Sequence, residues 1–191
     1  MNALQHDLQV ATTLRALSLM LRAPSADLKA QLEALAEPLV EDHRQALLAL
    51  ARLVPEDLEQ HYHRHLGPGG DCPTGESDYV PQAAGSKGAV LADVAGFYRA
   101  FRFDASAEMP ECPDHVAIEL SFLSWLHFKQ AHALHEAQPD NLEICRDAVA
   151  RFKSEHLDLW LSRFLDRLEA ISPVPFYAHV ARFSRACLSI H

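Results

Sequence analysis

The sequence predicts an all-α protein, a single-domain helical bundle of about eight to ten helices. Apolar residues recur at the three- and four-residue spacing of amphipathic helices along most of the chain. The first half contains no alternation of apolar and polar residues of the kind that predicts strands. With 191 residues, 49% of them hydrophobic, the chain is long enough to bury its own core, and we expect one domain spanning residues 1–191.

Residues 1–66 predict a group of N-terminal helices. Prolines stand between these helices, and Ser25 is suited to cap the second of them. Short connections of this kind favour antiparallel packing. The expected segments are Leu4–Leu21, Ser25–Leu35, Val40–Val54 and Pro55–Leu66.

Residues 67–88 predict a loop, because this segment is rich in glycine, proline, serine and aspartate. A connection of this length inside a compact domain is usually functional or mobile. Two interpretations stay open, a flexible surface loop and a lip beside a peptide groove. The segment contains neither GxxxxGK[ST] nor a strand followed by GxGxxG, so its glycines do not predict a nucleotide site.

Residues 89–191 predict C-terminal helices around a central helix at residues 113–136. Pro113 suits the first turn of that helix, and apolar side chains then fall on nearly every face, so we expect the helix to be buried. The other expected segments are Ala89–Phe101, Leu142–Phe152, His156–Ala170 and Phe176–Ile190.

One polar stripe interrupts the central helix. His115 and Glu119 lie one turn apart, in line with Phe122, and Asp114 lies at the positive end of the helix dipole. These groups could be a helix N-terminus whose polar side chains satisfy each other, or a recognition site.

Charge and cysteine content limit the function classes. The net charge of -9 argues against nucleic acid, which needs a positive surface, and is compatible with a basic partner. Four cysteines without CxxC spacing suit free thiols in a reducing cytosol. The N-terminal apolar patch is too short for a signal peptide or a membrane span, so we expect a cytoplasmic protein.

Two further classes stay open as alternatives. His61, His63 and His65 suggest a histidine-rich metal-binding protein, although no residues at suitable spacing complete a ligand set. The second alternative is a small helical enzyme centred on His115. The sequence lacks GxSxG, and no motif supplies the other catalytic residues that such an enzyme needs. We therefore expect no enzyme activity and no metal site.

The segment PDHVAIELSFL, residues 113–123, resembles the signature of the TorD/DmsD/NarJ family of redox-enzyme maturation chaperones. Residues 62–69 are similar to the family's Tyr-x-x-Leu-Phe-x-Gly-Pro-Gly pattern, and Glu76, Ser77 and Tyr79 to its Glu-Ser-x-Tyr, without the aromatic residue before the glutamate. His156, Trp160 and other aromatic residues resemble its C-terminal pattern. The resemblance covers about residues 58–183.

The resemblance implies a TorD-like cytoplasmic chaperone that binds the N-terminal, twin-arginine type leader of a molybdopterin-dependent oxidoreductase subunit. Such a chaperone assists cofactor insertion and prevents premature export. An alternative is a NarJ-type assembly chaperone, whose client faces the cytoplasm. We expect a monomer or a domain-swapped dimer. Guanine nucleotide and molybdopterin binding have been linked to the family, but the chain has no phosphate motif and we expect no cofactor. The candidate peptide-binding residues are Tyr62, Leu66, Glu76, Tyr79, Asp114, His115, Glu119, Phe122 and Trp125.

Overall fold

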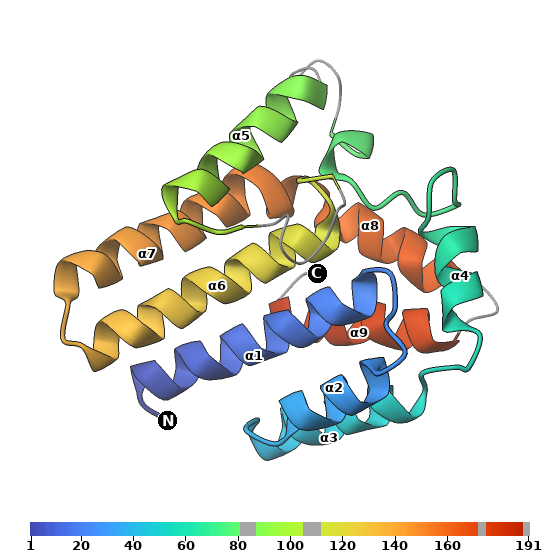
Figure 1. The fold of residues 1–191 in the computed structure, drawn as a ribbon, viewed down its shortest axis with the longest axis horizontal. Coiled ribbons are helices and arrows are strands. Elements are labelled where there is room, and N and C mark those ends of the chain that lie inside the picture. The colour runs from blue at the N-terminus through green and yellow to red at the C-terminus, as the bar shows by residue number, and fades with distance from the viewer. Residues whose placement is uncertain (81–86, 105–111, 172–174, 189–191) are drawn as a thin grey trace.

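The computed structural model describes residues 1–191 with gaps at 81–86, 105–111, 172–174 and 189–191. The regular elements in the described ranges are helices, which confirms the all-α prediction (Figure 1). In chain order they are α1 (Ala3–Leu21), α2 (Leu28–Ala36), α3 (Glu41–Arg52), α4 (Leu58–His65), η1 (Glu76–Asp78), α5 (Lys87–Ala100), α6 (Val116–His135), α7 (Pro139–Phe152), η4 (Lys153–Leu157), α8 (Asp158–Ala170) and α9 (Pro175–Leu188).

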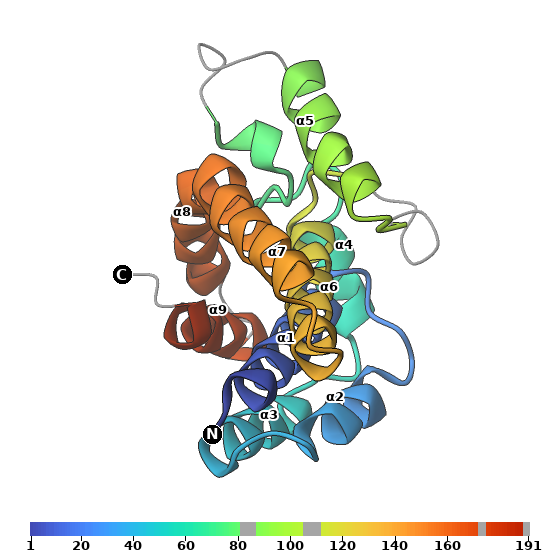
Figure 2. The same cartoon turned by 90° about the vertical axis from the view of Figure 1, so that its left-hand side faces the viewer.

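Helices α1 and α6 form the centre of the bundle and pack antiparallel along their length (Figures 1 and 2). Small hydroxyl groups lie in their interface: Ser18 Oγ donates to Ala117 O at 2.7 Å, and Ser124 Oγ donates to Ala11 O at 2.7 Å. A small side chain lets the two helix backbones approach closely, and its hydroxyl is satisfied by a carbonyl of the other helix. The predicted central helix is therefore α6.

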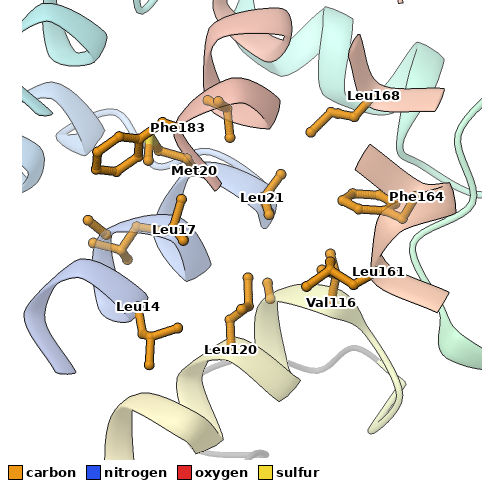
Figure 3. Close-up of a cluster of buried hydrophobic side chains, with 14 of the residues drawn as sticks. Leu14, Leu17, Met20, Leu21, Val116, Leu120, Leu161, Phe164, Leu168 and Phe183 are labelled. Atoms are coloured by element: carbon orange, nitrogen blue, oxygen red, sulfur yellow. The ribbon is translucent and has the colours of Figure 1, made fainter. Parts of the chain in front are cut away.

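The hydrophobic core lies where α1, α6, α8 and α9 converge (Figure 3). Leu17 of α1, Val116 of α6 and Phe164 of α8 are each 0% exposed. Full burial of one such side chain contributes about 1.5–3 kcal/mol, so this cluster stabilises the packing of the N-terminal end of α6 against α1 and α8. Helices α2 and α3 lie at one edge of the bundle and α5 at the opposite edge (Figures 1 and 2).

Several element boundaries differ from the expectation; α7, for example, begins at Pro139 and not at Leu142. The central helix begins at Val116 rather than at 113, because residues 113–115 form a turn in which His115 is the N-cap. The predicted loop 67–88 contains the 3-10 helix η1, and α5 begins inside it at Lys87. The segment predicted as a regular helix from His156 begins within the π-helical turn η4. Turns of these types depend on hydrogen bonds to distant parts of the chain or on packing, which apolar periodicity does not reveal.

Candidate functional site: a pocket beside the N-terminus of α6

A short segment, residues 73–79, lies antiparallel to the turn before α6, and we call it the strap. Gly75 and His115 form a β-bridge. Glu76 N donates to Asp114 O at 2.9 Å, and Val116 N donates to Thr74 O at 2.8 Å. The strap is thereby attached to the first turn of α6 through backbone groups.

The side chain of Asp114 fastens the strap further. Its Oδ2 atom accepts a hydrogen bond from Ser77 N at 3.0 Å, and Asp114 is 1% exposed. A Cβ atom on Gly75 would lie 3.1 Å from the same Oδ2, so glycine permits this close approach. Asp114 is thus part of the wall behind the strap and does not reach solvent.

A pocket of about 610 Å³, which we call the strap pocket, opens between the end of α4, the glycine-rich loop, the strap and the turn before α6. Three of the predicted residues line it, namely Tyr62, Leu66 and His115, so the structure brings together two segments that are about 50 positions apart in the sequence. The other lining residues are Ala23, His63, Gly67, Pro68, Gly69, Gly70, Pro73, Thr74, Asp78 and Cys112.

Glycines shape the wall of this pocket. A Cβ atom on Gly70 would lie 2.3 Å from the carbonyl oxygen of His65, and one on Gly67 would lie 2.6 Å from that of His63. Gly69 has φ of +80°, in the left-handed region that glycine adopts without strain. The loop therefore folds back over the C-terminal end of α4, which a larger residue at these positions would prevent.

His115 has two roles at the mouth of the pocket. Its Nδ1 atom accepts a hydrogen bond from Ala117 N at 3.1 Å and so caps α6. An Nδ1 atom that accepts cannot carry a proton, so the proton of the neutral ring is on Nε2. The ring is consequently fixed in one orientation while it lines the pocket.

Behind the strap lies a buried polar cluster, which we define as Glu76, Glu119 and His156. None of the three is more than 2% exposed. His156 Nδ1 lies 3.0 Å from Glu76 Oε2, and Trp160 Nε1 donates to Glu119 Oε2 at 3.3 Å. These contacts join the strap, α6, η4 and α8.

The protonation of this cluster follows from its burial. Desolvation raises the pKa of Glu119 well above its usual range, and the nearby carboxyl group of Glu76 raises it further. The neutral, protonated form of Glu119 is therefore favoured in the folded protein. Tyr98 stays neutral too, because burial raises the pKa of its phenol, whose hydroxyl donates to Pro113 O at 2.8 Å.

The remaining predicted residues lie outside the pocket lining. Tyr79 is 7% exposed, its hydroxyl donates to Pro73 O at 2.8 Å, and burial raises its pKa above the usual range. Phe122 is 0% exposed and packs against Tyr98, with ring centroids 4.8 Å apart. Trp125 lines a different groove with Phe128 on the α1 side of α6. Glu76, Asp114 and Glu119 support the pocket from behind.

Sequence reasoning missed two residues. Asp78 is the one carboxylate among the described lining residues of the pocket, and His156 is the imidazole of the buried cluster. The spacing of Asp78 two residues after Glu76 could have suggested that it lies near the site. For His156 the signal is the family's C-terminal pattern, since apolar periodicity alone does not distinguish it from a surface histidine.

The predicted histidine motif has other partners. His61 Nε2 lies 3.2 Å from Asp57 Oδ2, and His65 Nδ1 lies 3.2 Å from Asp71 Oδ2. Within the described ranges, no three or more His, Cys, Asp or Glu side chains are grouped so that they could hold a metal ion. Among the same residues, no helix has the length and apolar character needed to cross a bilayer.

Comparisons with known proteins give one family and several relatives. The model of the family described as "Nitrate reductase delta subunit" matches residues 10–166. A selenate reductase assembly chaperone protein of Thauera selenatis is 36% identical over 81 residues, which cover 42% of this chain and 41% of the relative. A chlorate reductase assembly chaperone protein of Ideonella dechloratans is 33% identical over 117 residues, covering 60% and 59%. Each match thus spans less than two thirds of the relative.

A solved structure shares the fold. It is the crystal structure of a candidate redox enzyme maturation protein from Archaeoglobus fulgidus, with a TM-score of 0.64 and 22% sequence identity. The alignment covers 94% of this chain and 93% of that one, so the similarity extends over the whole helical arrangement.

Proposed function

This chain belongs to the nitrate reductase delta subunit family, and from that premise we propose that it is an assembly chaperone for the catalytic subunit of a molybdopterin-dependent oxidoreductase. The names of the two relatives, chaperones for selenate and chlorate reductase, support this role. Both are named as chaperones rather than as enzymes, in agreement with the expectation that this chain is not an enzyme.

The chaperone binds the client's N-terminal leader, of the twin-arginine type, in the pocket beside the strap. It acts in the cytoplasm, where it holds the subunit until the cofactor is inserted and prevents premature export. The observation that carries this proposal is a pocket of about 610 Å³ whose walls combine the apolar Tyr62 and Leu66 with the carboxylate of Asp78 and the imidazole of His115. A leader has a basic end and an apolar segment, which matches this combination.

Hydrophobic contact sets the affinity in this proposal. Each buried leader side chain contributes about 1.5–3 kcal/mol, whereas ordering a flexible peptide costs several kcal/mol overall. An ion pair at the open mouth of the pocket adds only about 0–1 kcal/mol. Asp78 and the net charge of -9 therefore orient the basic end and accelerate encounter, while the apolar wall retains the peptide.

Purification of the tagged chain from its native cell, with mass spectrometry of retained proteins, tests the chaperone role. We expect the catalytic subunit of a molybdopterin oxidoreductase, and a synthetic peptide of that subunit's leader should then bind in calorimetry. Retention of unrelated proteins only would contradict the chaperone role. Retention of the subunit without binding of its leader would contradict the leader site alone.

A second candidate is a NarJ-type chaperone, whose client faces the cytoplasm. The description of the matching family, nitrate reductase delta subunit, favours it. The two candidates differ in the client, since only an exported client has its leader removed. N-terminal sequencing of the mature subunit distinguishes them.

A further inference from the structure

A second groove, which we call the α5–α7 groove, lies between α5 and α7. Its volume is about 440 Å³, and none of its described lining residues is shared with the strap pocket. Its apolar surface includes Phe97, Phe101 and Ile144, and Ile144 is 55% exposed. The other lining residues are Asp93, Gly96, Ala100, Asp147, Ala148 and Arg151.

Small residues leave room in this groove for the backbone of a partner helix. Gly96, Ala100 and Ala148 lie between the larger apolar side chains. No atom of the described residues would lie within 4 Å of a Cβ atom on Gly96, so these residues leave space above it. A helix can approach closely over such residues, with its larger side chains directed to Phe97 and Ile144.

The groove carries a negative charge. Asp93 and Asp147 line it, and its cation, Arg151, is held by Glu155, with Nε to Oε1 at 3.0 Å and Nη2 to Oε2 at 3.2 Å. The same guanidinium lies over the ring of Phe97, 5.3 Å from its centroid. Since Glu155 balances Arg151, the two aspartates set the charge that a ligand meets, and a basic group complements it.

A buried imidazole provides an independent observation at the same place. His156 is 2% exposed, and its Nε2 atom has no hydrogen-bond partner among the described residues. That atom faces Asp93 Oδ2 at 3.7 Å, which is within ion-pair range but too long for a hydrogen bond. The Asp93 side chain is 65% exposed, so its carboxylate lies at the rim between the interior and solvent.

We propose that the α5–α7 groove binds an amphipathic helix of a partner protein, and that a basic side chain at the edge of the helix's apolar face pairs with Asp93. This site goes beyond the leader pocket, because it uses different residues and selects an apolar helix with one flanking base. The basic side chain would pair with Asp93, which faces Nε2 of His156. The Nδ1 atom of the same ring contacts Glu76 of the strap. Occupation of the groove is thereby linked by direct contacts to the strap.

Calorimetry with three designed peptides tests the proposal. Each is a helix-forming peptide of about 20 residues, a length at which isolated helices become stable. The first has a leucine stripe with one arginine at its edge, the second has glutamate in place of the arginine, and the third has glutamine in place of the leucines. We expect the arginine peptide to bind about 5-fold more tightly than the glutamate peptide, and the third peptide not to bind.

Variants assign the binding to the groove. Asp93→Asn should reduce the discrimination between arginine and glutamate, and Ile144→Ser should weaken the binding of both leucine peptides about 5- to 10-fold. Leu159→Ser is the matched control, because Leu159 is 50% exposed on α8 and outside the groove lining, and this variant should bind as the parent does. Circular dichroism melts verify that each variant folds.

Three outcomes would overturn the proposal. The first is equal affinity for the arginine and glutamate peptides. The second is binding that Ile144→Ser leaves intact but Asp78→Asn abolishes, which would assign the peptide to the strap pocket. The third is a parent protein that forms a dimer in sedimentation and becomes monomeric on Ile144→Ser, which would assign the groove to a second copy of this chain. None of these outcomes depends on whether the leader binds elsewhere.

Discussion

The Nδ1 atom of His156 lies 3.0 Å from Oε2 of Glu76, and both side chains are 2% exposed. The two residues are 80 positions apart, one in the π-helical turn η4 and the other in the strap. This contact and the Trp160–Glu119 hydrogen bond hold the strap and α6 to the C-terminal helices. The strap pocket depends on it, because the strap forms one wall of that pocket.

Replacement of Glu76 should therefore reduce stability. Glu76→Ala removes a buried group that has a buried partner, and we expect a loss of about 3 kcal/mol in the free energy of unfolding, measured in urea. Glu76→Gln keeps an oxygen able to face His156 and should lose less. The matched control is Glu155→Gln, since Glu155 is half-exposed and its replacement should cost under about 0.5 kcal/mol. A Glu76→Ala variant as stable as this control would contradict the structural role.

The pKa of Glu119 predicts a pH dependence of stability. Burial raises this pKa in the folded state, so between the unfolded value of about 4.3 and the raised folded value only the folded state holds the proton. The group thus stabilises the protein fully below the unfolded pKa, and its contribution is lost as pH rises towards the folded pKa. Glu119→Gln, which mimics the protonated acid, should remove this dependence. The difference in unfolding free energy between variant and parent should grow as pH rises above 5, by up to about 1.4 kcal/mol per pH unit. A difference that stays constant over this range would mean that Glu119 is ionised in the folded state.

Two substitutions of His115 separate its role as the N-cap of α6 from its role in binding the leader peptide. His115→Ala should reduce stability by about 1 kcal/mol, because α6 loses the acceptor for Ala117 N. His115→Asn should restore most of that loss, since asparagine is a favoured N-cap, but it does not restore the imidazole in the pocket. We expect both variants to bind the leader peptide about 5- to 10-fold more weakly in calorimetry. Parent-like affinity of His115→Asn would remove the imidazole from the site.

Two glycines should respond oppositely to alanine. Gly70→Ala places a Cβ atom 2.3 Å from a backbone oxygen, so the loop must shift, and we expect a loss of about 2 kcal/mol or more together with weaker leader binding. Gly96→Ala, inside α5 with open space above it, should raise stability by about 0.5–1 kcal/mol. Thermal melts followed by circular dichroism measure both effects. Equal melting temperatures for the two variants would contradict the described path of the loop over α4.

The position of each predicted site residue explains why the site could be predicted only in part. His115, Glu119 and Phe122 do share a stripe, but Trp160 of α8 contacts Glu119, and helices α5 and α7 pack on Phe122. Only His115 of the three therefore lines the pocket. Trp125 is ten residues beyond His115, about 15 Å along the helix axis, and therefore lies over a different groove. Spacing along a helix predicts which residues share a face, but not what covers that face.

The sequence by itself determined the helical segments, the buried character of the central helix and the family, since apolar periodicity and the PDHVAIELSFL motif are local properties. Only the tertiary structure decided that the strap pairs with the turn before α6, that Glu76 and His156 meet, and that Asp78 reaches the pocket. The physical reason is that these contacts join segments tens of residues apart. Their formation depends on how the helices pack, and the periodicity of one segment carries no information about the segment that packs against it.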